Sequence, residues 1–386
     1  MKLQTIHNGR VLATAGRSIY LEGEGDGATN VGRLPAPAGS GIDFRLKTTP
    51  PFRSLVTTLT GRFPAVNVWS VGETLLASAD RWLFRSTDDG RTWSVVRTLP
   101  ASSAPMGVLP SAVCVADGSI YLGEYPLDGR TTPRILESDD GAEWSTVTAL
   151  DGVRHVHAVQ TDPYTGDIWV TTGDADAECR IGRLRDGQFE AVGSGDQSWR
   201  AVELAFTPSS VLWGVDSVYE ATKPIQKLSR NQFDAADPRP ETVHEVSSSV
   251  YYAETLRVDG DRWVLFSTSK EAGTDSTGPD SQTVHSDRAA VVAASSASEF
   301  TDWHELAAYR KRTTPVDRWN PGSAVPMANA YVFLAADPSR GVLLNPYNTD
   351  RDDGTIQLVP HRQLSKLTRD SSARDSSGRL PSFQAV

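Results

Sequence analysis

Residues that could transfer protons are concentrated in the segment Asp151–Asp174, which contains His155, His157 and Asp174. The two histidines are two positions apart, so on a β-strand both would point to the same face. Neutral imidazole can act as a general base, and a pair of imidazoles can also bind a metal ion. The alternative is a structural pair that is hydrogen-bonded to nearby carboxylates. We treat these three residues as catalytic candidates and predict no cofactor, with a metal at His155 and His157 as the less favoured alternative.

Two arginines occupy equivalent places in neighbouring parts of the chain, Arg154 before one predicted strand and Arg200 before a later one. Two guanidinium groups on adjacent strands could clamp a carboxylate or sulfate through paired hydrogen bonds. The alternative is that they form ion pairs with nearby acids. Aromatic and acidic residues at comparable positions would complete a pocket for a polar, hydroxylated or anionic ligand. Besides the two arginines, the candidates for ligand contact are Trp199, Glu124, Tyr125, Asp216, Arg318 and Trp319.

Short apolar strands that recur along the chain must position these residues. The clearest recurring element is a strand that follows a turn such as Asp117-Gly118, Thr165-Gly166 or Asp259-Gly260. Turn dipeptides of this kind favour tight hairpins. Most successive copies are about 40–60 residues apart, which is the period of a four-stranded unit. Seven copies occur, at 18–21, 74–78, 119–123, 167–171, 210–214, 262–266 and 330–334.

This repeat predicts an all-β fold, a β-propeller of four-stranded antiparallel blades, with seven blades favoured and six as the alternative. A single four-stranded sheet cannot bury both faces, whereas a closed ring of sheets covers the faces and leaves few edges. A β-sandwich does not repeat at this period. We expect one domain over residues 1–361, a flexible tail over 362–386, and a Ser/Thr/Asp/Gly-rich loop at Lys270–Arg288.

Propeller geometry predicts where the candidate residues meet. The first strand of each blade lines the central channel, and the second strand runs antiparallel to it. The start of each first strand and the end of each second strand therefore lie on the same face. Asp174 at a second-strand end, and His155 and Arg200 at first-strand starts, are expected at this channel mouth. Further residues expected there are Asn67, Trp69, Asp80, Met106, Asp176, Glu178, Tyr219, Lys223, Lys270, Glu271, Asn329 and Asp337.

Composition and charge exclude several classes of protein. The 386 residues carry 38 basic and 48 acidic side chains, a net charge of −10, and form no concentrated basic patch. We therefore expect no nucleic-acid partner. Two cysteines, Cys114 and Cys179, cannot build a disulfide framework. No run approaches 18 apolar residues and the N-terminus has no apolar signal segment, so we predict a cytoplasmic monomer without membrane contact.

Two predicted turns carry a recognisable motif. The segment Ser86–Trp93 fits the pattern Ser-x-Asp-x-Gly-x-Thr-Trp, and Ser138–Trp144 is a shortened copy. On these residues the chain resembles the sialidase-like propellers with BNR/Asp-box repeats. The resemblance implies a glycosyl hydrolase in which a Glu activates a Tyr nucleophile and arginines bind the substrate carboxylate. It would give the roles of nucleophile and activating carboxylate to Tyr251 or Tyr252 with Glu203 or Glu254. The third arginine stays unassigned, with Arg318 as a candidate.

Three functions remain open, because a propeller fold does not determine its activity. The first is a carbohydrate-active, hydrolase-like enzyme that takes a polar or anionic glycan at the channel mouth and uses two carboxylates. The second is a non-catalytic propeller that binds a sugar or serves as a scaffold for protein assembly. The third, less favoured, is a metal-assisted uronate lyase in which His155 or His157 removes a proton. A strongly shifted pKa beside an open cavity would favour an enzyme.

Overall fold

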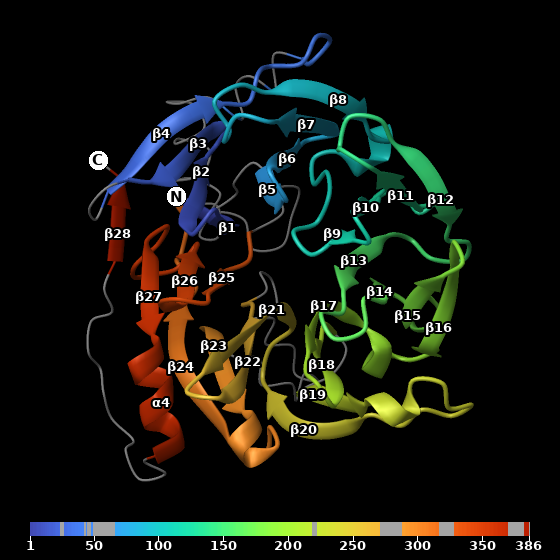
Figure 1. The fold of residues 1–386 in the computed structure, drawn as a ribbon, viewed down its shortest axis with the longest axis vertical. Coiled ribbons are helices and arrows are strands. Elements are labelled where there is room, and N and C mark those ends of the chain that lie inside the picture. Colours follow the sequence, from blue (N-terminus) through green and yellow to red (C-terminus); the bar gives the residue numbers. More distant parts are fainter. Residues whose placement is uncertain are drawn as a thin grey trace.

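Seven four-stranded antiparallel blades form a ring around a central channel, as the repeat predicted, and the first and last blades join edge to edge in one eight-stranded sheet (Figure 1). The structure is a computed structural model that describes residues 1–23, 27–41, 44, 48, 66–217, 222–270, 288–315, 328–369 and 382–385. Each blade is built from four consecutive strands, so the strand order within a blade follows the chain from the channel outward. The fold is a seven-bladed β-propeller.

The strand bounds follow blade by blade. Blade 1 consists of β1 (Lys2–His7), β2 (Arg10–Ala15), β3 (Ser18–Glu22) and β4 (Gly27–Arg33). Blade 2 consists of β5 (Val66–Val71), β6 (Thr74–Ala79), β7 (Trp82–Ser86) and β8 (Ser94–Thr98). Blade 3 consists of β9 (Val113–Ala116), β10 (Ser119–Gly123), β11 (Arg134–Ser138) and β12 (Ser145–Ala149). Blades 4 and 5 are β13 (Val156–Thr161), β14 (Ile168–Thr172), β15 (Arg180–Arg185), β16 (Gln188–Ser194); and β17 (Ala201–Phe206), β18 (Ser210–Val215), β19 (Lys223–Ser229), β20 (Glu241–Val246).

Blades 6 and 7 complete the ring and carry the one long helix among the described residues. Blade 6 consists of β21 (Val250–Val258), β22 (Asp261–Thr268), β23 (Arg288–Ser295) and β24 (Trp303–Arg310). Blade 7 consists of β25 (Tyr331–Asp337), β26 (Gly341–Tyr347), β27 (Ile356–Pro360) and β28 (Ser382–Ala385), with helix α4 (His361–Arg369) between its last two strands. Short 3₁₀ turns connect some of the strands, η1 (Ala101–Ser103), η2 (Asp176–Glu178), η3 (Gln197–Trp199), η4 (Arg230–Gln232) and η5 (Ser296–Ser298).

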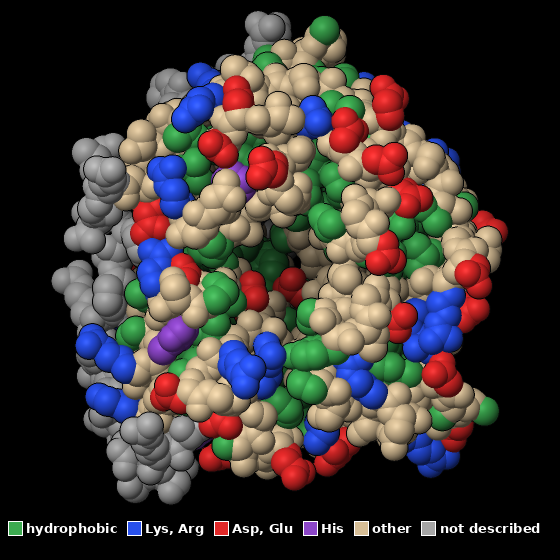
Figure 2. Space-filling model, viewed as in Figure 1, with side chains coloured by type: hydrophobic (Ala, Val, Ile, Leu, Met, Phe, Trp, Pro, Cys, Tyr) green, Lys and Arg blue, Asp and Glu red, His purple; other side chains and the backbone are tan. Residues whose placement is uncertain are grey.

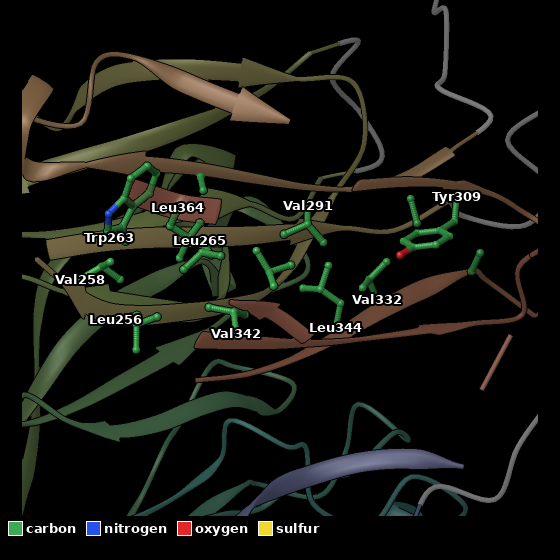
Figure 3. Packing of buried hydrophobic residues seen from close by; sticks show 14 residues of the cluster. Leu256, Val258, Trp263, Leu265, Val291, Tyr309, Val332, Val342, Leu344 and Leu364 are labelled. Atoms are coloured by element: carbon green, nitrogen blue, oxygen red, sulfur yellow. The ribbon is translucent and has the colours of Figure 1, made fainter. Parts of the chain in front are cut away.

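The hydrophobic core consists of apolar layers between neighbouring blades. Between blades 6 and 7, Trp263 and Leu265 of β22 pack with Val342 and Leu344 of β26, and all four are almost fully buried (Figure 3). Leu364 of α4 joins the same cluster. Each blade therefore buries both faces against its neighbours, which gives the ring the closure that a lone four-stranded sheet lacks.

The ring closes where the first and last blades meet. Strand β28 pairs antiparallel with β27 and parallel with β4, the outermost strand of blade 1. Nearer the channel, the N-terminal amine of Met1 donates to the carbonyl of Gly354 at 2.7 Å, and the Leu3 amide donates to Asn345 Oδ1 at 2.9 Å. The segment from 362 onward was expected to be a flexible tail. Of the described residues in that segment, 362–369 lie in α4 and 382–385 form β28, the outermost strand of blade 7.

The predicted strand register is right for blades 2 to 6 and wrong for the first and last blades. The segment at 18–21 lies in β3, the third strand of blade 1, and most of the segment at 330–334 lies in β25, the first strand of blade 7. Strands in different positions of a blade have similar apolar patterns, so an error of one strand leaves the repeat intact. It moves Asp337, however, to the end of a first strand, at the opposite face from the predicted mouth.

The two motif turns have the same local structure. In the turn between β7 and β8, Asp88 accepts hydrogen bonds from the amide and hydroxyl of Thr92 at 2.9 and 2.7 Å. The indole of Trp93 donates to the carbonyl of Gly90, which has a φ of +83°. Between β11 and β12, Trp144 Nε1 donates in the same way three residues back, at 3.0 Å.

A third turn of this kind was not apparent in the sequence. At the start of β24, Trp303 Nε1 donates to the carbonyl of Phe300 at 2.9 Å, again three residues back. Phe300 takes a φ of +65° where the other two turns have glycine. The same indole hydrogen bond therefore forms in this turn, although the turn lacks the glycine of the sequence pattern. Among the described residues, no helix has the length and apolar character needed to cross a membrane.

Candidate functional site

Asp174 is the centre of a cluster of charged and aromatic residues at one end of the channel. It follows β14, and one of its carboxylate oxygens, Oδ2, accepts from Arg154 Nη1 at 2.9 Å. The other oxygen, Oδ1, accepts from Arg200 Nη2 at 3.0 Å. The same Arg200 nitrogen lies 3.2 Å from Asp216 Oδ2. The two arginines predicted to clamp a ligand thus both hold Asp174, which was the alternative interpretation.

The two histidines face this carboxylate from the same blade. His155 Nε2 lies 3.3 Å from Asp174 Oδ2, and His157 Nε2 lies 3.9 Å from Asp174 Oδ1. The imidazole centroids are 5.1 Å apart, so the histidines share one face as their spacing predicted. The ring of Tyr125, which follows β10, stacks on His155 with a centroid distance of 3.9 Å. Both histidines are only 2% exposed.

The backbone at Asp174 is strained. Its φ is +143°, whereas the other non-glycine residues with positive φ among the described residues lie between +48° and +65°, in the ordinary left-handed region. A conformation this far from the allowed regions costs about 1–3 kcal/mol and persists only where the surroundings impose it. Gly173 allows the crowding, because a Cβ there would lie 2.9 Å from His157 Cε1 and 3.0 Å from Arg200 Cγ.

Electrostatics fix the charge state of the cluster. Burial alone would raise the pKa of Asp174, but the neighbouring His155 and Arg200 outweigh it and hold this pKa well below its usual range. The pKa of His157 is lowered to about 3, mainly by burial, with contributions from the nearby His155 and Arg200. Burial also raises the pKa of Tyr125, with Asp174 and Asp216 adding to the effect. Near neutral pH, Asp174 is therefore ionised, whereas His157 and Tyr125 are uncharged.

β-Bulges place several candidates on the innermost strands of three consecutive blades. His157 lies at the irregularity in the pairing of β13 with β14, between Val156 and Ala158. In β17 the irregularity spans the positions of Val202 and Glu203, and in β21 it falls at Tyr251. A bulged residue leaves the regular alternation of the strand, which re-aims its side chain. Tyr251 interacts electrostatically with Arg200 and so belongs to the Asp174 cluster.

The remaining catalytic candidates occupy a cavity inside the channel. The cavity has a volume of about 260 Å³ and is lined by residues of the innermost strands β1, β5, β9, β17, β21 and β25. Glu203, Tyr252 and Glu254 contribute to its wall together with Lys2 and Asn67. Figure 2 shows the hollow at the centre of the ring on the face viewed there, with acidic side chains at its edge.

Three ionisable groups that line this cavity, Glu203, Glu254 and Lys2, have pKa values shifted to between about 7 and about 8. Burial raises the pKa of Glu203 to about 8, and the proximity of Glu254 contributes to the shift. Burial raises the pKa of Glu254 to about 7 and lowers that of Lys2 to about 7. Lys2 donates to Asn67 Oδ1 and to the Val66 carbonyl. Burial therefore favours the neutral forms of Glu203, Glu254 and Lys2 near neutral pH, most strongly for Glu203 among the two glutamates.

The structure places two other candidates in structural roles. Trp199 is 6% exposed and stacks on Trp213 inside the hydrophobic core between blades 4 and 5, with centroids 5.4 Å apart. Glu124 is fully buried and accepts two hydrogen bonds from Arg134, at 2.8 and 2.6 Å. Neither side chain is available to a ligand at the channel mouth. Four expected mouth residues lie outside the described residues, Arg318, Trp319, Tyr219 and Glu271.

Sequence reasoning missed three contributors to these two clusters. Lys2 lies at the start of the chain, ahead of the first recognised repeat, so nothing in the pattern placed it in the channel. Gly173 carries no reactive group, although its position beside Asp174 is a signal of close packing. Gln197 donates to the Asp174 carbonyl at 3.1 Å and to Asp176 Oδ1 at 2.8 Å, and no motif marks it.

Comparisons with known proteins extend to the fold alone. No family model matches the chain, and no curated protein matches it. A puromycin-hydrolyzing peptidase of Mycobacterium tuberculosis is similar in structure, with a TM-score of 0.54 and 12% identity over 100% of this chain and 53% of the peptidase. An ancestral GH74 enzyme has a TM-score of 0.53 and 11% identity over 92% of this chain and 43% of the enzyme.

A third similar structure is an oligogalacturonate lyase in complex with manganese, and here the match extends over most of both chains. Its TM-score is 0.47, with 11% identity over 90% of this chain and 88% of the lyase. By contrast, the chain spans only about half the length of the peptidase and of the GH74 enzyme. At identities this low, the likeness establishes the propeller fold, and any activity has to be argued from this chain's own residues.

Proposed function

We propose that this propeller is a carbohydrate-active, hydrolase-like enzyme that binds one polar glycosyl unit in the channel cavity. Glu203 and Glu254 would be its acid and base. The observation that supports the proposal is the presence of two carboxyl groups in one cavity, with pKa values raised to about 8 and about 7. Perturbed carboxyl groups beside an open cavity are typical of active sites.

The two pKa values suit the two halves of glycoside hydrolysis. A carboxyl group with a pKa of about 8 remains protonated at neutral pH and can donate its proton to the leaving oxygen. Glu254, with a pKa of about 7, is partly ionised and can act as base or nucleophile. Glycosidases obtain such a difference in pKa between two carboxyl groups by placing them in unlike surroundings.

The size and wall of the cavity suggest a small, hydroxylated ligand. Its volume of about 260 Å³ is just below the ~300–1,000 Å³ of sites for drug-sized ligands. A single sugar ring is therefore a better match than a polymer segment. Carboxyl, ammonium and amide groups from Glu203, Glu254, Lys2 and Asn67 can bind hydroxyl groups, and Tyr252 and Phe333 supply aromatic surface.

This arrangement favours a carboxylate pair over a tyrosine nucleophile. Tyr252 lies beside Glu203, but burial raises the pKa of its phenol well above the usual value, and Tyr331 and Glu203 raise it further. The described residues that line the cavity include no arginine that could bind a substrate carboxylate. Arg154 and Arg200 are instead committed to Asp174. We therefore assign the acid and base roles to the two glutamates.

One contact favours a second candidate function, a non-catalytic scaffold. Glu203 accepts a hydrogen bond from the Ala253 amide at 2.7 Å and so links β17 of blade 5 to β21 of blade 6. A protonated glutamate in that place could serve only to join the two blades. In that case, its replacement by glutamine would preserve the fold and would have no enzymatic consequence.

Turnover assays distinguish the two functions. The purified chain is incubated with aryl glycosides, sialosides and uronate oligosaccharides at low and high salt, beside Glu203→Gln, Glu254→Gln and the exposed control Glu143→Gln. We expect hydrolysis of at least one substrate class, lowered on the order of 100-fold or more in the two cavity variants and unchanged in the control. Absence of turnover by a cooperatively folded wild-type protein, or equal turnover by all variants, would favour the scaffold.

A further inference from the structure

The histidines and the aspartate of the mouth cluster have no part in the carboxylate mechanism proposed above. Their potential ligand atoms, one from each of His155, His157 and Asp174, all lie within 4.8 Å of one another. Two of the three residues are almost completely buried. What could occupy the space between these atoms depends on where the imidazole protons are.

Backbone contacts determine the tautomer of each histidine. His155 Nδ1 lies 3.4 Å from the carbonyl of Pro126, and His157 Nδ1 lies 3.1 Å from the carbonyl of Ala201. A carbonyl oxygen can only accept, so each Nδ1 must carry the proton. In the neutral imidazoles, both Nε2 atoms then present lone pairs toward the Asp174 carboxylate. A backbone carbonyl on the far nitrogen is also the usual way in which proteins orient metal-binding histidines.

This arrangement leaves a buried acceptor unsatisfied. His155 Nε2 makes no hydrogen bond to any residue that the structure describes, although Asp174 Oδ2 lies 3.3 Å away. When both imidazoles are neutral, their two lone pairs and the carboxylate converge without a donor and repel one another, which is costly inside a protein. A cation placed among the three groups removes this repulsion by accepting all of the lone pairs.

The spacing suits a first-row transition ion. Zinc–nitrogen and zinc–oxygen bonds of about 2.0–2.1 Å place neighbouring ligand atoms of a tetrahedron about 3.3 Å apart. The separation of His155 Nε2 from Asp174 Oδ2 has this value. His157 Nε2 lies 3.9 Å from the other oxygen, Oδ1, so a bound ion would draw the His157 ring closer. Two imidazoles and one carboxylate form a common donor set for zinc and iron, with open positions for water or substrate.

The arginines around the carboxylate are compatible with this role. Arg154 takes one lone pair of Oδ2 and Arg200 takes one of Oδ1, so each oxygen keeps a second lone pair for the histidine side. The charges of Asp174 and Asp216 offset those of the two arginines, and a bound dication would leave the cluster positive. The open coordination positions would therefore favour an anionic group, close to the partly exposed Arg154.

We propose that His155, His157 and Asp174 form a binding site for a divalent transition-metal ion such as Zn²⁺. Arg154, Arg200 and Gly173 act as positioning residues, because they fix the carboxylate or allow its close approach. None of the three proposed ligands lines the cavity that holds the glutamate pair, so the proposal does not depend on the proposed hydrolase activity. The competing arrangement is an imidazolium at His155 that donates its Nε2 proton directly to Asp174.

Cobalt and zinc titrations test the site. The full chain is stripped with a chelator and titrated with Co²⁺, read by its visible ligand-field bands, and with Zn²⁺ against a competing indicator. Variants His157→Gln and Asp174→Asn are compared with the control His304→Gln, whose His304 lies 3.6 Å from Asp302 in a separate histidine–aspartate pair. Circular dichroism confirms that each variant is folded.

We expect one equivalent of Co²⁺ or Zn²⁺ to bind to the wild type and to His304→Gln, and Kd to rise at least 100-fold in His157→Gln and Asp174→Asn. If only Asp174→Asn fails to fold, His157→Gln carries the test. Absence of stoichiometric binding by the folded wild type would overturn the proposal, as would equal binding by all variants. An Nε2 proton on His155, observed by ¹⁵N NMR in the presence of saturating Zn²⁺, would also overturn it in favour of the imidazolium.

Discussion

Arg200 on blade 5 donates to the carboxylate of Asp174 on blade 4 at 3.0 Å. The same nitrogen contacts Asp216, which follows the second strand of blade 5, at 3.2 Å. One guanidinium group therefore binds carboxylates from two adjacent blades. Because Arg200 is only 12% exposed and Asp216 only 6%, the interaction lies largely out of water. The charged cluster is accordingly a structural joint between two blades as well as a candidate site.

Removal of Arg200 should destabilise the whole propeller. We expect Arg200→Ala to lower the free energy of unfolding by about 3 kcal/mol, because it removes the guanidinium that Asp174 and Asp216 share in a poorly hydrated place and leaves Asp174 with Arg154 alone of the two arginines. Urea denaturation followed by tryptophan fluorescence measures the change. Arg239→Ala removes the exposed pair with Asp237 and should leave stability unchanged. Equal effects of the two substitutions would contradict the role given to Arg200.

The glutamates of the cavity should make stability decline with rising pH. In the unfolded chain they release protons near their ordinary pKa of 4.5, whereas in the folded chain they retain them up to about 8 and about 7. The folded state therefore binds more protons across this interval, and the free energy of unfolding falls as pH rises through it. Urea denaturation of the wild type and of Glu203→Gln/Glu254→Gln between pH 5 and pH 7 isolates the effect.

Subtraction of the double variant removes the contributions of the neighbouring groups. Lys2 and Tyr252 face the same cavity and are present in both proteins. Lys2 acts in the opposite direction at higher pH, since its lowered pKa of about 7 makes stability rise between there and 10.5. A wild-type-minus-variant difference that is flat or rises between pH 5 and pH 7 would show that the glutamates are ionised in the folded protein.

The two cysteines should be unreactive in the native state. Burial raises the pKa of Cys114 from 9.0 to about 12, which lowers its thiolate fraction at neutral pH about 1,000-fold. Burial also raises the pKa of Cys179, whose side chain is fully buried. We expect a disulfide reagent such as Ellman's to label neither thiol at an appreciable rate until denaturant is added. Rapid labelling of the native chain would mean that the channel wall opens around Cys114.

The motif turns should affect stability and leave metal binding intact. Trp93→Phe keeps an aromatic ring but removes the indole donor that contacts the Gly90 carbonyl at 2.8 Å. We expect a loss of about 1 kcal/mol in the free energy of unfolding, and a similar loss for Trp144→Phe in the equivalent turn. Thermal denaturation and Co²⁺ titration of the same samples measure both properties. Weakened Co²⁺ binding by either variant would tie these turns to the site.

The sequence sufficed to predict the ring and its blade number, because a repeat of four strands leaves few other ways to bury each sheet. It also predicted that His155 and His157 share a face with Asp174. It could not assign the strand register in blades 1 and 7, where one apolar strand resembles the next. Strand β28 was not predicted for a different reason. Helix α4 separates it from β27 in the sequence, and its other partner, β4, lies near the N-terminus.

The division of the candidates into two clusters was also beyond prediction. Tyr251 and Tyr252 are neighbours in the sequence, yet one interacts with Arg200 and the other lines the cavity with Glu203. A regular strand would point these two side chains to opposite faces, but a β-bulge at Tyr251 interrupts the alternation, and the two ring centroids lie 6.4 Å apart. Bulges have no reliable signature in a single sequence, so distances between side chains on bulged strands have to come from the structure.

The bulges at His157, Val202–Glu203 and Tyr251 also bear on how such a protein can evolve. Residues in a bulge contribute little to the hydrogen-bonded ladder that holds a blade together. Mutations there can alter the chemistry of the inner ring while the scaffold keeps its pairing. In these three neighbouring blades, the side chains at the bulges can vary while the strand pairing stays constant, much as loops vary on the scaffold of other folds. Related chains would then diverge fastest in ligand preference at these positions and slowest in the layers between blades.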